Sequence, residues 1–219
     1  MRQLKKIILI CCVTIAAVFI FLSATKSPAL DAITKTQSNF KNGDIIFQTS
    51  QSEQCEAVRI ATNSKFSHCG IIFIENGKTY VYEAVQPVKM TLLSDWIQHG
   101  EGNKYVVKRL QNADKLLNND VIEKMKSYGE TMNNKDYDIY FEWSNDKIYC
   151  SELVWKIYKE GANIELCNLQ KLKEFNLEHP LVKTILKERY GNTVPLDEEV
   201  VAPSQIVDSN KLITVFDNY

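Results

Sequence analysis

The feature that most constrains this chain is a tight hairpin signal in its first half. The apolar run Cys69–Ile74 is followed by Asn76-Gly77 and then by a second run rich in β-forming residues, Thr79–Val85. An Asn-Gly pair between two such runs is typical of a two-residue β-turn, because both positions tolerate a left-handed backbone. The pattern therefore predicts an antiparallel hairpin whose register is set by the turn.

This register brings two chemically active side chains together. With two turn residues, Gly70 lies opposite Glu83, and His68 lies one pair further along on the same face. Gly70 has no side chain, which leaves room between them. A carboxylate in this position can fix the tautomer of the imidazole and raise its basicity. A three-residue turn would reverse the parity and separate the pair, and Glu83 would then face only solvent or a nearby lysine.

The other two histidines of the chain have simpler explanations. His99 precedes Gly100 at the end of a predicted helix, where an imidazolium interacts favourably with the helix dipole. His179 stands beside Pro180 in a polar stretch typical of a loop. His68 is the histidine that enters an apolar strand, and it is the candidate base.

Cys150 is the candidate nucleophile because a helix is predicted to begin there, running to Lys159 with Gly161 just past its end. Unpaired N–H groups and the positive end of the dipole stabilise a thiolate at this position and lower its pKa. A neighbouring His68 would complete a nucleophile–base pair, and the backbone N–H of Cys150 would serve as an oxyanion donor. The alternative is a small buried hydrophobe at the start of a helix.

The remaining cysteines show no metal-binding spacing. Cys55 lies on a predicted helix and is expected to pack, Cys69 points to the face of its strand opposite to His68, and Cys167 follows a helix without an evident partner. The chain has no CxxC pair and no His–Cys cluster at zinc spacing, so no metal and no organic cofactor are expected. Oxidative pairing of Cys150 with Cys55, Cys69 or Cys167 is left open.

The N-terminus has the pattern of an export signal or a membrane anchor, assigned to residues 1–25. Arg2, Lys5 and Lys6 precede the uncharged, apolar run Ile7–Ala24. This run is close to the spanning threshold of about 18 residues, and Leu22-Ser23-Ala24 is a mediocre cleavage site, which favours an uncleaved anchor over a cleaved signal peptide. In either case the rest of the chain is exported to the cell envelope.

Residues 26–41 are polar and are expected to form a linker, which leaves residues 42–219 as one α+β domain. A net charge of −1 gives no reason to expect a nucleic-acid partner. The expected strands are 45–47, 69–74, 79–85, 105–110 and 212–216. The expected helices are 92–98, 150–159 and 181–188, one capped at Ser50 that runs to Thr62, and one capped at Asn118 or Asn119 that runs to Tyr128.

Four segments occur in one order along the chain: Asn42-Gly43-Asp44-Ile45-Ile46-Phe47, Phe66-Ser67-His68-Cys69-Gly70, Tyr82-Glu83-Ala84-Val85 and Ile148-Tyr149-Cys150-Ser151-Glu152. Together they resemble the YiiX/YebB-type branch of the circularly permuted, NlpC-related papain-like cysteine hydrolases, over residues 43–206. The resemblance implies a permuted papain-like (NlpC-type) fold, in which an antiparallel sheet packs against helices that include the nucleophile helix.

The resemblance also implies roles for particular residues. Cys150 would be the nucleophile, His68 the base and Glu83 the residue that orients it, and the chain order His, Glu, Cys is the order that permutation produces. Related enzymes use a tyrosine hydroxyl as a second oxyanion donor. Tyr137 is the closest match here, and Tyr149 is its competitor.

Three functions follow as hypotheses. The first is an exported cysteine hydrolase of amidase or peptidase type that cleaves an amide or acyl bond in an envelope peptide or a lipid-linked substrate. The second is a lipid acyltransferase that passes through a thioester, and the third is a non-catalytic envelope module that binds lipid or peptide.

Two further stretches have competing explanations. Apolar residues within Gln170–Arg189 could line an acyl pocket, but one core-facing helix is the preferred interpretation. The run Asp197-Glu198-Glu199 is interpreted as a solvated loop, not a metal site.

Overall fold

The computed structural model describes residues 39–219, and residues 40–219 form a compact unit. Phe40 belongs to this unit, two residues ahead of the expected boundary, because its ring is buried against the edge of Phe216. The predicted signal or anchor at residues 1–25 and most of the predicted linker lie outside the described residues. Within residues 39–219, no helix has the length and apolar character needed to cross a membrane.

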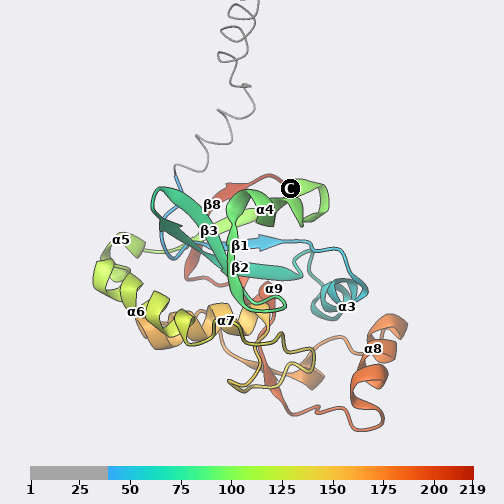
Figure 1. Ribbon diagram of the computed structural model, residues 1–219. Coiled ribbons are helices and arrows are strands. Elements are labelled where there is room, and N and C mark those ends of the chain that lie inside the picture. Colours follow the sequence, from blue (N-terminus) through green and yellow to red (C-terminus); the bar gives the residue numbers. More distant parts are fainter. Residues whose placement is uncertain (1–38) are drawn as a thin grey trace, which may run out of the picture. The chain divides into compact units, whose positions relative to one another are not determined.

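The centre of the fold is a six-stranded antiparallel sheet (Figure 1). Its order is β4-β3-β2-β1-β5-β8, so the predicted hairpin β2–β3 lies between β1 and β4. The strands are β1 (Ile45–Gln48), β2 (His68–Glu75), β3 (Lys78–Glu83), β4 (Lys89–Leu92), β5 (Val106–Leu110) and β8 (Leu212–Asp217). A separate two-stranded ribbon pairs β6 (Gln170–Lys171) with β7 (Glu199–Val200).

Helices cover both faces of this sheet. The α-helices are α3 (Glu53–Thr62), α4 (Leu93–Gln98), α5 (Ala113–Leu116), α6 (Asn119–Glu130), α7 (Cys150–Lys156), α8 (Pro180–Tyr190) and α9 (Pro203–Val207). Three single turns complete the set: η1 (Glu101–Asn103), η2 (Ile157–Gly161) and η3 (Leu172–Glu174). In Figure 1, α6 and α7 lie along one face of the sheet and α4 lies on the other.

The two faces carry two apolar clusters, as the alternation of side chains along a strand requires. Phe47 and Ile71 point toward Leu153 of α7 and form part of the larger cluster. Ile46 and Ile72 point the other way, toward Trp96 of α4. The central strands are therefore buried on both sides, which explains why β1 and the first half of β2 are almost continuously apolar.

The hairpin prediction is confirmed. Glu75 pairs with Lys78, so the turn consists of Asn76 and Gly77 alone. Both turn residues have positive φ angles, 51° and 73°, as a type I′ turn requires. The register continues through Ile71 and Tyr82, which leaves Gly70 opposite Glu83 as predicted.

The helix ends are partly different from the predictions. Helix α3 begins at Glu53, but its N-cap is Ser52, whose hydroxyl accepts from the Cys55 N–H; the prediction of Ser50 as the cap is wrong. Helix α6 is capped by Asn118, one of the two predicted alternatives. Helix α7 starts at Cys150 as predicted, but α geometry ends at Lys156 and one π turn, η2, follows it.

The interpretation of Gln170–Arg189 as one core-facing helix is wrong. The first part of this stretch forms β6 and the single turn η3, and helix α8 begins only at Pro180. His179 is the N-cap of α8, since its Nδ1 accepts from the Leu181 N–H at 3.3 Å. The apolar residues ahead of Pro180 are thus free to take another role, which concerns the site described below.

Candidate active site

His68 and Glu83 form a buried pair at the end of the hairpin. His68 is the first residue of β2 and Glu83 the last of β3, and they lie diagonally across Gly70. The distance from His68 Nε2 to Glu83 Oε2 is 2.6 Å, with only 8 % and 2 % of the two residues exposed. The sequence-derived face and register are therefore correct for this pair.

Two further residues fix the pair, and neither was predicted. The Thr91 hydroxyl donates to Glu83 Oε1 at 2.6 Å, so both carboxylate oxygens have partners. The Trp96 ring stacks on the imidazole with centroids 5.9 Å apart and planes 26° from parallel. Thr91 lies in β4, a strand that the sequence pattern did not indicate, and Trp96 reaches His68 only because α4 folds back over the sheet.

Gly70 is required at its position because the neighbouring strand approaches closely. A Cβ atom there would lie 2.4 Å from Val81 Cγ1 and 2.8 Å from the Tyr82 carbonyl oxygen. Any side chain would therefore push β3 away from β2. Because His68 and Glu83 stand diagonally across this residue, such a shift would separate them.

Cys150 is the first residue of α7 and only 4 % exposed. Its sulfur interacts with Cys69 and with the His68 imidazole. The interaction with the Cys69 thiol is the largest influence that lowers the pKa of Cys150. Burial opposes it, but with the added attraction of His68 the pKa of Cys150 lies well below its ordinary value. These surroundings favour the thiolate form of Cys150.

The pKa of the His68 imidazole shifts upward, in the opposite direction to that of Cys150. Burial on its own would lower the pKa of His68, but the interactions with Cys150 and Glu83 outweigh it and raise the pKa to about 10. Burial likewise would raise the pKa of Glu83, and the hydrogen bonds from His68 and Thr91 bring it below its ordinary value. The three shifts favour alternating charge along the chain of groups: thiolate, imidazolium and carboxylate.

The other cysteines of the described chain do not share this chemistry. All of them are free thiols, so none of the pairings left open by the sequence is present. Burial and the bond to Cys150 raise the pKa of Cys69 well above its ordinary value, so it stays protonated and acts as a donor. Burial raises the pKa of Cys167 to about 11. The sequence placed Cys69 away from the chemistry because it did not show that α7 packs on that face of the sheet.

Tyr137 lies beside Cys150 in the loop that precedes α7. Its hydroxyl oxygen accepts a hydrogen bond of 3.2 Å from Gln54 Nε2, and Gln54 Oε1 accepts one of 2.7 Å from Arg189. Arg189 in turn lies over the Phe141 ring at 5.3 Å. Burial and the negative charge of Cys150 raise the pKa of Tyr137 well above its ordinary value, so the hydroxyl keeps its proton.

Tyr149, the competing tyrosine, is held differently. Its hydroxyl accepts from the backbone N–H of Val201 at 3.2 Å, and its ring packs edge-on against Phe141 at 5.2 Å. It immediately precedes the nucleophile helix and is almost fully buried. Its oxygen is therefore tied to the segment that leads into α9. Gln54 donates to the Tyr137 oxygen in the same way, so each of the two hydroxyls keeps a proton that it can donate.

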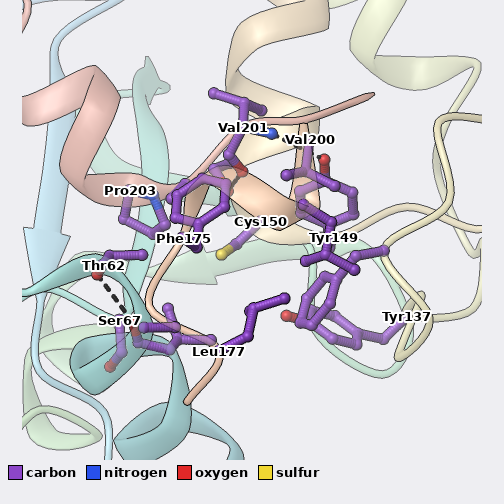
Figure 2. Close-up of a pocket in the computed structure, with 16 residues that line it drawn as sticks. Thr62, Ser67, Tyr137, Tyr149, Cys150, Phe175, Leu177, Val200, Val201 and Pro203 are labelled. Atoms are coloured by element: carbon purple, nitrogen blue, oxygen red, sulfur yellow. Dashed lines mark hydrogen bonds between the residues drawn. The ribbon is translucent and has the colours of Figure 1, made fainter. Parts of the chain in front are cut away.

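An apolar pocket opens beside the Cys150 sulfur. Figure 2 shows this sulfur among the side chains of Phe175, Leu177 and Tyr137. The pocket has a volume of about 560 Å³, its open mouth included, and is walled by α3, the loop around residues 137–141, residues 172–177 and residues 200–203. Three apolar residues of the stretch that was interpreted as a helix, Leu172, Phe175 and Leu177, line it.

The remaining sequence candidates lie away from this site. His99 is the C-terminal cap of α4, the position predicted for it. In the Asp197-Glu198-Glu199 run, Asp197 pairs with the exposed Lys173, and Glu198 accepts from the Trp143 N–H. Gln54 and Arg189 were not predicted, and no sequence pattern marks them, because α3 and α8 meet only in the folded chain.

The chain is similar to known proteins over nearly the whole described region. Residues 39–216 match the family described as permuted papain-like amidase enzyme, YaeF/YiiX, C92 family. The chain is 46 % identical over 175 residues to the uncharacterized protein YiiX of Escherichia coli (strain K12), an alignment that spans 80 % of this chain and 85 % of that one. A crystal structure of metalloprotein yiiX from Escherichia coli O157:H7 superimposes with a TM-score of 0.78 at 45 % identity, covering 82 % of this chain and 98 % of that one.

Proposed function

This chain belongs to the YaeF/YiiX (C92) family of permuted papain-like amidases, and from that membership we propose that it is an exported cysteine amidase with Cys150 as its nucleophile. His68 is the general acid and base, and Glu83 orients it. The observation that carries the proposal is the buried 2.6 Å bond between His68 and Glu83, together with the electrostatic interaction of His68 with Cys150.

The first half-reaction forms a thioester. The Cys150 thiolate attacks the carbonyl carbon of an amide, and the carbonyl π electrons move onto oxygen. The backbone N–H of Cys150 and the Tyr137 hydroxyl donate to this oxyanion. The His68 imidazolium gives its proton to the amide nitrogen, the C–N bond breaks and the amine leaves. The acyl group is now bonded to sulfur, and His68 is neutral.

The second half-reaction regenerates the enzyme. The neutral His68 takes a proton from water, and the resulting hydroxide attacks the thioester carbonyl. The C–S bond breaks, the carboxylic acid leaves, and the thiolate and the imidazolium are restored. Glu83 holds the ring in one orientation through both steps and stabilises each imidazolium.

The experiment that tests this function is the trapping of the acyl intermediate. The purified full chain is mixed with 4-nitrophenyl acetate, and the release of nitrophenol is followed while mass spectrometry locates the acetyl group. We expect a burst of nitrophenol and an acetyl group on Cys150. Acetylation that is spread over Cys55 and Cys167, with no burst, would contradict the proposal and favour the non-catalytic binding module.

Transfer of the acyl group to a lipid acceptor is the second candidate function, because the apolar pocket beside the nucleophile would hold an acyl chain and limit the access of water. Product analysis in the presence of phospholipid vesicles distinguishes hydrolysis from acyl transfer. Release of the free acid supports the amidase, whereas an acylated lipid supports the transferase.

Substrate and location are part of the same proposal. The amidase kind of the family favours a peptide amide as partner, with a lipid-linked acyl group as the alternative. Residues 1–25 direct the domain to the cell envelope and associate it with the membrane, as their basic and apolar pattern indicates. A fusion of residues 1–41 to alkaline phosphatase tests the export, because that reporter is active only after export.

A metal does not enter the proposed reaction. The solved relative is described as a metalloprotein. In residues 39–219 of this chain, however, the structure brings no three His, Cys, Asp or Glu side chains together in a way that could hold a metal ion. The His68, Glu83 and Cys150 side chains interact with one another instead, so the proposed reaction contains no metal-dependent step.

Replacing Tyr137 by phenylalanine is expected to lower kcat by about 10²-fold, because one of the two oxyanion donors is lost. KM should change little, since the ring still packs in the pocket wall. The Tyr149→Phe variant is the matched control and should retain kcat within about threefold. A Gln54→Met variant, which leaves Tyr137 without its anchor, should fall between the two. Equal effects at Tyr137 and Tyr149 would contradict the assignment of the donor.

Replacing Thr91 by valine is expected to lower kcat by about 3- to 10-fold, because Glu83 loses one charge-stabilising hydrogen bond. Valine has nearly the shape of threonine, so the packing around Glu83 is retained. The Thr91→Ser variant keeps the hydroxyl and should behave like the wild type. If valine and serine gave the same rate, the bond to Glu83 would have no part in catalysis.

A further inference from the structure

We infer that Arg189 is a positioning residue for the oxyanion donor Tyr137. Acting through Gln54, its guanidinium fixes the direction in which the Tyr137 hydroxyl donates, and its positive charge makes that hydroxyl a stronger donor. The inference rests on the proposed role of Tyr137 and deepens it, because it identifies the group that sets the strength of this donor.

Arg189 lies at the far end of a short chain of hydrogen bonds that leads to the active site. It is in the last turn of α8, a helix that lies beside α3, which carries Gln54 (Figure 1). The Arg189 guanidinium donates to Gln54 Oε1 at 2.7 Å, and Gln54 Nε2 donates to the Tyr137 oxygen at 3.2 Å. Tyr137 lines the same pocket as Cys150 (Figure 2). Three segments that are distant in the sequence therefore meet beside the nucleophile.

The chemistry of arginine fixes the direction of each bond in this chain. A guanidinium has N–H donors and no acceptor, so the Gln54 atom that faces Arg189 must be the amide oxygen. The amide nitrogen of Gln54 then faces Tyr137, and because an NH₂ group of an amide only donates, the Tyr137 oxygen must accept. The Tyr137 proton is therefore free to bond the oxygen of a substrate carbonyl.

The charge of Arg189 is not neutralised by direct contact with a carboxylate. Among residues 39–219, no aspartate or glutamate forms an ion pair with it, and its partners are the Gln54 amide and the Phe141 ring. The buried Asp138 carboxylate accepts from two backbone N–H groups instead, at 2.8 and 2.6 Å. Burial lowers the pKa of Arg189, but a guanidinium stays charged at neutral pH. A half-buried cation with neutral partners thus stands behind the hydroxyl.

This charge acts on the Tyr137 hydroxyl through the Gln54 amide. Donation from a cation polarises the amide, and each bond in such a chain strengthens the next. Burial is the largest influence on the pKa of Tyr137 and raises it, whereas the charge of Arg189 lowers it. A more acidic O–H group donates more strongly to a negatively charged oxygen. The benefit therefore arises in the transition state, where that charge forms, and not in the binding of the substrate.

Tyr149 lacks this support. Its hydroxyl accepts from the uncharged backbone N–H of Val201 at 3.2 Å. Burial raises its pKa, and the negative charge of Glu152 raises it further. Both tyrosines keep a proton that they can donate, but the charge of Arg189 strengthens Tyr137 alone as a donor.

The test follows the acylation of Cys150 by 4-nitrophenyl acetate in the full chain, from the rate of the nitrophenol burst. Arg189→Met nearly keeps the length of the side chain and removes its charge. This change should slow acylation at saturating ester about 10-fold, while the half-saturating ester concentration changes little. Arg189→Lys restores the charge without the planar fork and should recover part of the loss. Lys187→Met removes a positive charge from an exposed position of the same helix, and this matched control should react like the wild type.

Two further variants show whether Arg189 acts through the hydroxyl. In a Tyr137→Phe background, Arg189→Met should have no further effect beyond about twofold, because the group on which it acts is missing. Gln54→Glu keeps the shape of the side chain and its bond to Arg189, but a carboxylate accepts from the Tyr137 hydroxyl and turns its proton away from the substrate. This variant should lose about 10²-fold in acylation, as much as Tyr137→Phe.

Alkylation by iodoacetamide separates this effect from damage to the nucleophile. The Cys150 thiolate displaces iodide from a CH₂ carbon and no oxyanion forms, so Arg189→Met should react at the wild-type rate. The inference is overturned if Arg189→Met acylates like the wild type, loses the same factor in the Tyr137→Phe background, or loses as much in alkylation as in acylation. Each of these outcomes leaves the amidase proposal standing. Failure of the wild type to be acylated at Cys150 overturns both.

Discussion

Replacing Cys150 by serine is expected to lower kcat/KM by about 10⁴-fold or more, even though serine differs by one atom. The site holds a sulfur whose pKa is already lowered by Cys69 and His68, so the thiolate exists before the substrate arrives. A serine hydroxyl is far less acidic and would remain protonated in the same environment. His68, poised as an imidazolium, could not then act as its base.

Steady-state kinetics with 4-nitrophenyl acetate, together with thermal unfolding, measure this effect. Cys167→Ser is the matched control, because burial keeps Cys167 protonated and it lies outside the site. The control should retain its activity, and both variants should unfold at temperatures close to that of the wild type. A Cys150→Ser variant with more than about a tenth of the activity would mean that another group is the nucleophile.

Replacing His68 by asparagine is expected to lower kcat by about 10³-fold or more, because the leaving amine loses its proton donor and water loses its base. The same change should lower stability by about 2–4 kcal/mol, since Glu83 is 2 % exposed and would keep only the Thr91 hydroxyl as a partner. The His68→Asn substitution is therefore expected to lower both kcat and the free energy of unfolding.

A second substitution distinguishes the two effects. In the His68→Asn, Glu83→Gln double variant no unpaired carboxylate remains, so the free energy of unfolding measured in urea should recover by about half or more. The activity should not recover, because the acid and base are still missing. Recovery of activity together with stability would show that His68 acts only through folding.

The parts of the site that could be predicted are those fixed by local geometry. The two-residue turn at Asn76-Gly77 determines the register of β2 and β3, and the register alone places His68 diagonal to Glu83. The position of Cys150 at the start of a helix follows in the same way from the apolar periodicity after it. The similarity to the permuted papain-like family and the corresponding fold are confirmed by the match over residues 39–216 and by the solved relative.

The parts that could not be predicted depend on packing between distant segments. Cys69 faces Cys150 only because α7 crosses that side of the sheet, and Gln54 supports Tyr137 only because α3 lies near the loop before α7. Thr91 belongs to a four-residue strand whose sequence, Lys-Met-Thr-Leu, has no strong β pattern. No fixed separation along the sequence relates the residues that make these contacts, so a sequence pattern cannot predict them.

The stretch after Gly161 shows the limit of periodicity most clearly. Its apolar residues have the spacing of one helix face, yet η3 and a loop form the first part, and Leu172, Phe175 and Leu177 turn toward Cys150. Residues that pack against the core and residues that line a cavity are both apolar, so they have the same pattern in the sequence. The sequence therefore indicates that these side chains avoid water, but not what they surround.

The most direct measurement of the central claim is the pH dependence of the alkylation of Cys150 by iodoacetamide in the full chain. A thiolate paired with an imidazolium should react at a constant rate from neutral pH to about pH 9, because the pKa of Cys150 lies well below its ordinary value and that of His68 is about 10. In the His68→Asn variant the rate at neutral pH should fall and rise again toward alkaline pH. A wild-type rate that climbs tenfold per pH unit through neutrality and levels off only above about pH 8.5, as for an ordinary thiol, would contradict the account.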